Sequence, residues 1–249
     1  MNKTKIDWTD MSWNPVTGCL HDCTYCYAKG ITHRFGSPEN ANGELHVLDI
    51  AEIRKGKDGA YVANPYPFGF DPTFHKYRLE QPAHTKVPQR IFVGSMTDLF
   101  GEWVPDEWIM QVFSACQRAI GHTYMFLTKN PARYWKLFDD GKLLLYDDIW
   151  YGSTITGAEK SLTYVTGLRV NTFLSIEPIM NKVEIPEESL AEINWVIIGA
   201  ETGSGKKVVP ERSWIENIVA ACNAARVPVF MKSNLEEVWG EPLIQELPH

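Results

Sequence analysis

Short apolar segments recur at nearly regular intervals from residue 90 to the end of the chain. Each is rich in β-branched and aromatic residues and is followed by a polar or glycine-containing turn and an amphipathic stretch. The segments start about 23 to 33 residues apart, a spacing typical of consecutive βα units. The predicted strands are 91–95, 124–128, 149–154, 172–176, 195–199 and 227–231, with an earlier strand near 12–16. The predicted helices are 106–120, 131–139, 158–168, 187–192 and 213–225.

Near-continuous apolar strands that alternate with helices indicate a parallel sheet covered by helices. Six or seven such units favour an α/β fold in the form of a partial or nearly closed (β/α) barrel. A doubly wound sheet is the alternative, but the sequence has no G-x-G-x-x-G turn to support dinucleotide binding. A length of 249 residues suits one large α/β domain, so we expect residues 1–249 to form a single domain.

The stretch 30–88 interrupts this rhythm with many glycines and prolines. Two β-like runs, 45–53 and 60–63, flank Lys55-Gly56-Lys57-Asp58-Gly59, which predicts a hairpin turn. Long insertions in compact domains are usually functional or disordered. We therefore expect residues 30–88 to form an inserted lid or substrate-side subdomain.

The composition is typical of a soluble globular protein, with 44% hydrophobic and 22% charged residues. No apolar run approaches the roughly 20 residues that span a bilayer, and the N-terminus leads into no apolar signal segment. We therefore expect a cytoplasmic protein without a membrane partner. The net charge of −7 argues against a broad phosphate-binding surface but leaves room for a local basic groove, so nucleic acid stays open as a partner.

Three cysteines lie within eight residues, Cys19, Cys23 and Cys26, with the spacing C-x3-C-x2-C. Three thiolates from one short loop can bind three irons of a cubane cluster and leave the fourth iron open to a cofactor or substrate. A zinc site of these cysteines and His21 is an alternative, although its ligands lack the usual spacing. A disulfide framework fits poorly because the neighbouring thiols are odd in number. The two remaining cysteines lie in helical patterns and are interpreted as buried core residues: Cys116 and Cys222.

Polar residues follow most of the predicted strands. In parallel βα barrels the functional groups lie where strands end and loops begin. Four charged residues lie at such positions: Lys129, Glu177, Glu201 and Lys232. Because a buried charge costs several kcal/mol unless it is paired or used, two interpretations stay open. The charges pair with one another, as Lys232 could with Glu177, or they contact a ligand.

The cysteine spacing, with Tyr25 directly before the last thiol, resembles the signature of the radical S-adenosylmethionine (SAM) superfamily. The resemblance implies a [4Fe-4S] cluster bound by Cys19, Cys23 and Cys26, with the open iron chelated by the amino and carboxylate groups of S-adenosyl-L-methionine. It also implies that the reduced cluster cleaves SAM to a 5′-deoxyadenosyl radical. Tyr25 would lie near the adenine.

The same resemblance suggests further cofactor contacts by position in a barrel. Ser95, Thr97 and Asp98 follow the next strand, where relatives present backbone and acidic groups to the methionine amine. This chain departs from the family there, because it has no Gly-Gly-Glu at that point. The residues expected to contact ribose or substrate are Ser153, Glu177 and Glu201.

A longer pattern resembles a smaller group, the phage-associated three-cysteine-motif proteins of the radical SAM type. The matching segments are Trp8-Thr9, Trp13-Asn14-Pro15-Val16-Thr17-Gly18-Cys19, Gly69-Phe70-Asp71 with His75, Ser95-Met96-Thr97-Asp98-Leu99-Phe100, Leu127-Thr128-Lys129, Leu174-Ser175-Ile176-Glu177-Pro178 and Gly199-Ala200-Glu201-Thr202-Gly203. They span nearly the whole chain. Many members of the group have a longer gap between the first two cysteines, whereas this chain has the three-residue gap of the wider superfamily.

We therefore expect a radical SAM enzyme that acts on an unidentified substrate, with a nucleobase or nucleic acid favoured by the phage association. A flavodoxin- or ferredoxin-type protein would supply the electron. The alternative is a non-catalytic zinc- or iron–sulfur-binding module. His75, in the inserted stretch, is expected to face either the substrate or the solvent.

Overall fold

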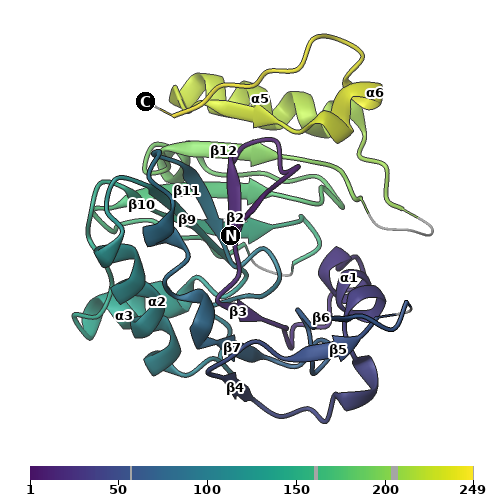
Figure 1. The fold of residues 1–249 in the computed structure, drawn as a ribbon. Coiled ribbons are helices and arrows are strands. Elements are labelled where there is room, and N and C mark those ends of the chain that lie inside the picture. The colour runs from purple at the N-terminus through teal and green to yellow at the C-terminus, as the bar shows by residue number, and fades with distance from the viewer. Residues whose placement is uncertain (57, 160–161, 203–206, 249) are drawn as a thin grey trace. The chain divides into compact units, whose positions relative to one another are not determined.

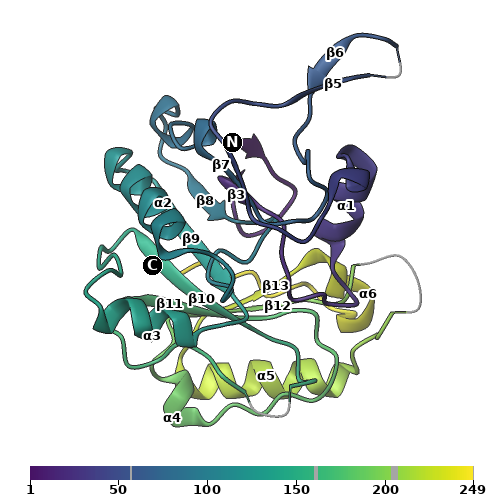
Figure 2. The same ribbon diagram turned by 90° about the horizontal axis from the view of Figure 1, so that it is seen from below.

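The computed structural model describes residues 1–56, 58–159, 162–202 and 207–248. The fold is mixed α/β and has a large, mostly parallel sheet (Figure 1, Figure 2). The chain divides into two compact units, which we call unit 1 (residues 1–4 and 10–124) and unit 2 (residues 5–9 and 125–249). It passes from unit 1 to unit 2 within strand β9 (Thr123–Thr128). In the described part of the chain the strands do not close into a barrel.

The sheet strands of unit 1 are short. β1 (Asn2–Lys3) pairs antiparallel with β2 (Met11–Trp13), and β2 pairs parallel with β8 (Arg90–Val93). The strand predicted at 91–95 is confirmed, and its apolar residues are buried as expected. The strand predicted near 12–16 is divided at Asn14-Pro15, because a proline has no N–H to donate to a sheet.

A second, three-stranded sheet of unit 1 lies next to the cysteines in the chain. β3 (Val16–Thr17) pairs antiparallel with β7 (Thr73–His75), and β7 pairs parallel with β4 (His46–Leu48). Two of these three strands therefore come from the stretch that we predicted to be an insertion. Residues of 30–88 thus help to hold β3, the strand that leads into the cysteine loop.

The predicted hairpin is present as β5 (Ile53–Lys55) and β6 (Tyr61–Ala63), paired antiparallel. Its first strand is shorter than predicted, because the run 45–53 divides into β4 and β5. Lys57, in the predicted turn, lies outside the described residues. In Figure 2 the hairpin projects from the rest of unit 1, and most of its side chains are exposed.

Two α-helices belong to unit 1. α1 (Tyr27–Phe35) follows the cysteine loop directly, and α2 (Asp106–Arg118) confirms the helix predicted at 106–120. α2 begins after Pro105 with two acidic residues in its first turn, where negative charge favours the helix dipole. Three short 3-10 helices complete the described elements of this unit: η1 (Pro38–Asn40), η2 (Lys76–Arg78) and η3 (Pro82–His84).

Unit 2 contains the regular part of the sheet. The parallel strands follow one another in chain order: β10 (Ile149–Ile155), β11 (Asn171–Ile176), β12 (Trp195–Ile198) and β13 (Val229–Met231). Every residue of β10, β12 and β13 is buried, which is typical of parallel strands covered on both faces. The predicted strands in this region are confirmed within two residues at each end.

Helices and an N-terminal segment cover these strands. α5 (Arg212–Ala225) lies along β12 and β13 in both views and buries Ile215, Ile218 and Cys222 against the strands' apolar side chains (Figure 1, Figure 2). Trp8, from the segment 5–9, packs with its ring 5.9 Å from that of Phe173. The other helices of this unit are α3 (Ala132–Asp139), α4 (Glu187–Leu190), α6 (Glu236–Trp239) and the 3-10 helix η4 (Ser233–Leu235).

The helix predicted at 158–168 is wrong for the described residues of that range, since neither 158–159 nor 162–168 is helical, and 160–161 lie outside the described chain. Apolar residues three apart, at Leu162, Val165 and Leu168, imitate a helical period. Instead, Val165 is buried, and its N–H donates to Ser153 Oγ in β10 over 2.8 Å. Tertiary contact with the strand replaces the helical hydrogen bonds.

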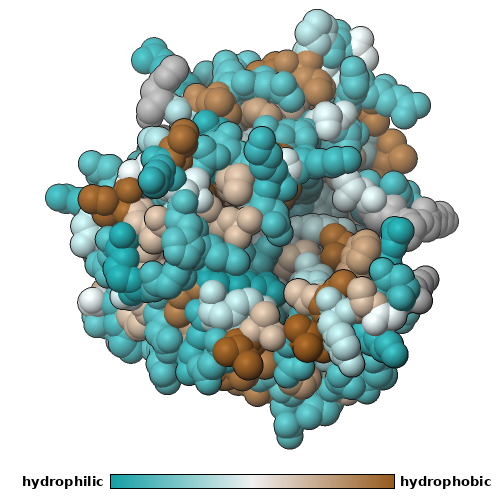
Figure 3. Space-filling view, in the orientation of Figure 1, coloured by the Kyte–Doolittle hydropathy of each residue, from teal (hydrophilic) through white to brown (hydrophobic). Residues whose placement is uncertain are grey.

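No helix in the described ranges is long and apolar enough to cross a membrane. On the face shown in Figure 3, hydrophilic residues dominate the surface and hydrophobic residues form small separate patches.

Candidate functional site

The three neighbouring cysteines lie on the loop between β3 and α1 in unit 1. Cys19, Cys23 and Cys26 are each half-buried, and all three are free thiols. Cys26 is the N-terminal cap of α1, and its N–H donates to the carbonyl of Cys23 over 3.1 Å. The loop therefore ends at a helix N-terminus, where N–H groups and the helix dipole favour negative charge. We call residues 18–26 the cysteine loop.

The start of the cysteine loop is bound to the segment that follows β8. The N–H of Gly18 donates to the carbonyl of Met96 over 2.9 Å, and Thr97 Oγ1 donates to the carbonyl of Gly18 over 2.6 Å. At the other end of the loop, the hydroxyl of Tyr27 donates to the carbonyl of Ser95 over 2.5 Å. Residues 95–97 therefore hold both ends of the loop through backbone groups and one threonine hydroxyl.

The opposite side of the loop contacts residues 70–71. The N–H of Cys19 donates to the carbonyl of Phe70 over 3.1 Å. Gly18 has φ +86°, and a Cβ at this position would lie 2.1 Å from the carbonyl oxygen of Asp71. Only glycine satisfies both the left-handed backbone and the close approach. The first cysteine is thus positioned from two sides by segments far apart in the chain.

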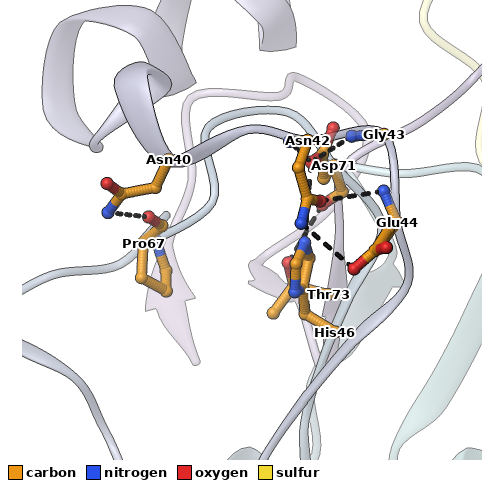
Figure 4. A network of polar contacts seen from close by, with 8 residues as sticks. All are labelled: Asn40, Asn42, Gly43, Glu44, His46, Pro67, Asp71 and Thr73. Atoms are coloured by element: carbon orange, nitrogen blue, oxygen red, sulfur yellow. Dashed lines mark hydrogen bonds and ion pairs between the residues drawn. The ribbon is translucent and has the colours of Figure 1, made fainter.

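A polar network fixes the segment that carries Phe70 and Asp71 (Figure 4). Asp71 is buried, and its Oδ2 accepts the N–H groups of Asn42 and Gly43 over 2.7 and 2.9 Å. His46 Nε2 lies 3.5 Å from the same oxygen, with its ring stacked on Phe68 at 3.7 Å between centroids. The network therefore ties residues 42–46 to the segment against which the cysteine loop packs.

Inside the loop, His21 contacts two residues that follow β8. Its Nε2 lies 2.8 Å from Asp98 Oδ2, and its ring meets Trp103 edge-on at 4.8 Å between centroids. Asp98 Oδ1 accepts the N–H of Phe100 over 3.0 Å. Asp98 was predicted from the sequence as a contact of the methionine amine, whereas in this structure both of its oxygens have protein partners. That role remains a prediction.

The remaining predicted residues near the loop occupy different environments. Tyr25 is half-buried within the cysteine loop, and Ser95 Oγ hydrogen-bonds the side chain of Asn14. Thr97 is half-buried and bonded to Gly18. The structure thus places Tyr25, Ser95, Thr97 and the cysteines in one unit, while their predicted contacts with SAM stay predictions.

Burial raises the pKa of the Cys19 thiol to about 12. A backbone hydrogen bond at His21 opposes this rise in pKa, whereas the charges of Asp98, Cys23 and Cys26 add to it. Cys19 is therefore a protonated thiol at neutral pH in the metal-free loop. A metal ligand must be a thiolate, so metal binding here releases a proton.

The donor set fits an iron–sulfur cluster. Three free thiols on one loop can each bind a different iron of a cubane cluster. In the described residues no three His, Cys, Asp or Glu side chains converge as ligands of one ion.

The predicted contact residues of unit 2 lie at the carboxyl ends of its strands. Ser153 is fully buried in β10, and its Oγ accepts the N–H of Val165. Glu177 follows β11 and forms a half-buried ion pair with Lys232, which follows β13. Glu201 Oε2 accepts the N–H of Val208 over 3.1 Å. The pairing of Lys232 with Glu177, one of the two interpretations that the sequence left open, is therefore present.

His75 contradicts its prediction, because it faces neither solvent nor an open site. It is fully buried, with Nε2 2.8 Å from Thr17 Oγ1 and Nδ1 3.1 Å from the hydroxyl of Tyr77. Burial lowers the pKa of His75 to about 2, and the charge of Arg78 adds to this effect. His75 is a neutral residue that fastens β7 to β3, next to the cysteine loop.

Sequence reasoning named His21 and Asp98 separately but missed their contact, and it missed Trp103 and the carbonyl of Phe70. The motif Gly69-Phe70-Asp71 was a usable signal for the role of the Phe70 carbonyl, since this motif belongs to the longer pattern of resemblance. No local pattern indicates the contact with Trp103.

Comparison with known proteins gives one family. The family model described as "Protein of unknown function (DUF5131)" matches residues 3–243. No curated protein matches the sequence. Among solved structures, a mutant of spore photoproduct lyase aligns with 96% of this chain and 76% of its own, at 9% sequence identity and a TM-score of 0.47. Since the family model covers nearly the whole chain, this protein belongs to the DUF5131 family.

Proposed function

We propose that this protein is a radical SAM enzyme whose cysteine loop binds one [4Fe-4S] cluster through Cys19, Cys23 and Cys26. When bound, the cluster and SAM would supply the 5′-deoxyadenosyl radical that takes a hydrogen atom from a substrate. The observation that carries the proposal is the loop itself. Three free, half-buried thiols lie between β3 and α1 and are held by backbone bonds from residues 70 and 95–97.

The protein's own residues would act on the cofactors in stated ways. The thiol of Cys19 would lose its proton when it becomes a ligand. Because burial raises the pKa of this thiol, its deprotonation would depend on metal binding. The bonds of Gly18 to Met96 and Thr97 hold the first ligand in place before any metal arrives. Preformed ligand positions lower the ordering cost of binding.

Further parts of the proposal rest on the resemblance and on position. Tyr25 would lie near the adenine, and Ser95, Thr97 and Asp98 near the methionine group of SAM. The residues proposed to contact ribose or substrate are Ser153, Glu177 and Glu201. The whole chain would act as one domain with a partial barrel, and residues 30–88 would form a lid or substrate-side subdomain. A flavodoxin- or ferredoxin-type donor in the cytoplasm would supply the electron, and the substrate class is a nucleobase or nucleic acid.

The test is anaerobic purification, rebuilding of the cluster with iron and sulfide, and addition of SAM with dithionite. The expected product is 5′-deoxyadenosine, and it should be lost in Cys23→Ala. Cys116→Ala is the matched control, because it removes a buried thiol of α2 outside the loop. A cluster that forms but never cleaves SAM would reject the enzyme and leave an iron–sulfur-binding module.

The second candidate is a non-catalytic module that binds zinc. It would yield colourless, air-stable protein whose fold depends on the metal. The free thiols of the loop are as compatible with a zinc ion as with a cluster. The hydrogen bond between His21 Nε2 and Asp98, however, leaves only Nδ1 of this imidazole as a zinc ligand.

A further inference from the structure

The bond between His21 and Asp98 joins the cysteine loop to the end of β8 through side chains. His21 lies between the first and second cysteines, and Asp98 lies 77 residues later in the chain. The side chain of Asp98 is 7% exposed and that of His21 is 24% exposed. Both partners are therefore largely removed from water, where a hydrogen bond to a carboxylate is stronger than at the surface.

Asp98 is itself held rigidly. Its Oδ1 accepts the N–H of Phe100 over 3.0 Å, which favours an orientation of the carboxylate toward the backbone that follows β8. The ring of Trp103 also meets the His21 ring edge-on, at 4.8 Å between centroids. The imidazole is thus fixed by a carboxylate at Nε2 and by an indole beside the ring.

Other contacts of the loop lie at its two ends, and Asp22 in the middle forms an exposed ion pair with Lys29 over 2.6 Å. Gly18 and Cys19 are bound through their backbone, and Tyr27 is bound through its hydroxyl. Between them, Asp22 is exposed and has φ +51°, a left-handed conformation that costs free energy in a residue other than glycine. His21 is the residue beside Asp22 whose side chain is anchored, so it is suited to hold this turn.

We propose that His21 and Asp98 form a positioning pair for the cysteine loop, in which the fixed carboxylate holds the imidazole and the imidazole holds the turn between Cys19 and Cys23. Only the expected effect of the pair on a bound cluster rests on the proposed function. Its effect on the loop exists without any metal. Neither residue is a ligand in this proposal.

The carboxylate has a second effect. Asp98 Oδ2 lies 2.8 Å from the imidazole of His21, which stands two residues from both Cys19 and Cys23, so the carboxylate brings its charge to the cysteine loop. The same charge disfavours the addition of an electron to a nearby cluster, because reduction makes the cluster more negative. Replacing the carboxylate by an amide keeps a hydrogen-bonding partner for His21 but removes this charge.

The experiment compares wild type with His21→Ala, Asp98→Asn, Asp98→Ala and the control His33→Ala. His33 is an exposed residue of α1 that takes no part in the pair. The first measurement is backbone hydrogen exchange of residues 18–26 in metal-free protein, followed by mass spectrometry. The second is iron content and reduction potential after anaerobic reconstitution. The thermal unfolding transition of each variant distinguishes a local loosening of the cysteine loop from global unfolding of the chain.

We expect exchange of the loop to accelerate about tenfold in His21→Ala and in Asp98→Ala, the factor for one lost charge-assisted hydrogen bond. Asp98→Asn should restore most of the protection, and its cluster should have a higher reduction potential than that of wild type. His33→Ala should match wild type in every measurement. Because none of these substitutions alters a buried hydrophobic residue, we expect each variant to keep a cooperative unfolding transition.

Unchanged exchange in His21→Ala would overturn the pair. An unchanged reduction potential in Asp98→Asn would overturn the effect of the Asp98 charge on the cluster. If wild type binds no cluster while the exchange results hold, the proposed function fails and the pair stands as a support of the loop. If wild type binds a cluster and His21→Ala changes neither exchange nor iron content, the function stands and the pair fails.

Discussion

The hydroxyl of Thr97 donates to the carbonyl of Gly18 over 2.6 Å and so ties the end of β8 to the residue before the first cysteine. The bond joins positions 79 residues apart in the chain. It is supported by the reciprocal backbone bond from Gly18 to Met96. The position of the cysteine loop is thus determined by long-range contacts rather than by the loop's own sequence.

Removal of that hydroxyl should weaken the loop. Thr97→Val keeps the shape of the side chain but leaves the carbonyl of Gly18 without this donor, at an expected cost of about 1 kcal/mol in the free energy of unfolding. Thr97→Ser keeps the hydroxyl and serves as the control. Denaturant unfolding of metal-free protein measures the difference. Equal stability of the valine and serine variants would show that the bond contributes nothing.

A Cβ at Gly18 should be far more costly than one at a comparable glycine. Gly18 and Gly43 have nearly the same φ, +86° and +81°, but only Gly18 has atoms within 4 Å of the added carbon. Gly18→Ala should therefore destabilise by about 2 kcal/mol more than Gly43→Ala, since the second variant reports the backbone strain alone. Unfolding midpoints in denaturant measure both. Similar costs would mean that the approach of Asp71 is not tight in solution.

The buried imidazole of His75 should make stability depend on pH. Its pKa is lowered to about 2 in the folded protein but is near 6.5 in the unfolded chain, so between these values the unfolded chain binds more protons. Stability should therefore fall as the pH drops below 6.5, with a slope from this group of at most about 1.4 kcal/mol per pH unit.

The matched variant for this effect is His75→Gln, which keeps polar atoms for Thr17 and Tyr77 but does not titrate. The free energy of unfolding of both proteins, measured from pH 7.5 to pH 5, should converge as the pH falls. Parallel curves would show that His75 is not held neutral in the folded state.

The ion pair of Glu177 and Lys232 should show strong coupling. The two side chains are 22% and 16% exposed, so removal of one partner leaves a charge in a poorly hydrated place. A double-mutant cycle with Glu177→Gln and Lys232→Met should give a coupling of about 1 to 3 kcal/mol. The exposed pair Lys182–Glu184 is the control, with an expected coupling below about 1 kcal/mol. Equal coupling in both pairs would contradict a structural role for Glu177 and Lys232.

The strands were predictable from the sequence because each is a run of apolar residues bounded by polar or glycine-rich turns, and in the structure these runs are buried. The periodicity at Leu162, Val165 and Leu168 misled for a physical reason. Ser153 accepts the N–H of Val165, so the segment satisfies its backbone against β10 and not within a helix. Local pattern cannot reveal a partner twelve residues away.

The candidate site shows the same limit. The cysteines were recognisable because their spacing is local and chemically specific. The pairing of His21 with Asp98 and the burial of His75 depend on segments that meet only in the folded chain. A histidine in a Gly- and Pro-rich stretch looks solvated, and the β3–β7 pairing that buries His75 cannot be read from residues 70–78 alone.

The most direct measurement is the metal and sulfide content of protein purified without oxygen. A cubane cluster predicts about four irons and four acid-labile sulfides per chain after reconstitution, lost in Cys23→Ala and kept in Cys116→Ala. An electron paramagnetic resonance signal of the reduced cluster that changes on addition of SAM would place the cofactor at the open iron. About one zinc per chain, with no labile sulfide, in protein never exposed to air would contradict the cluster.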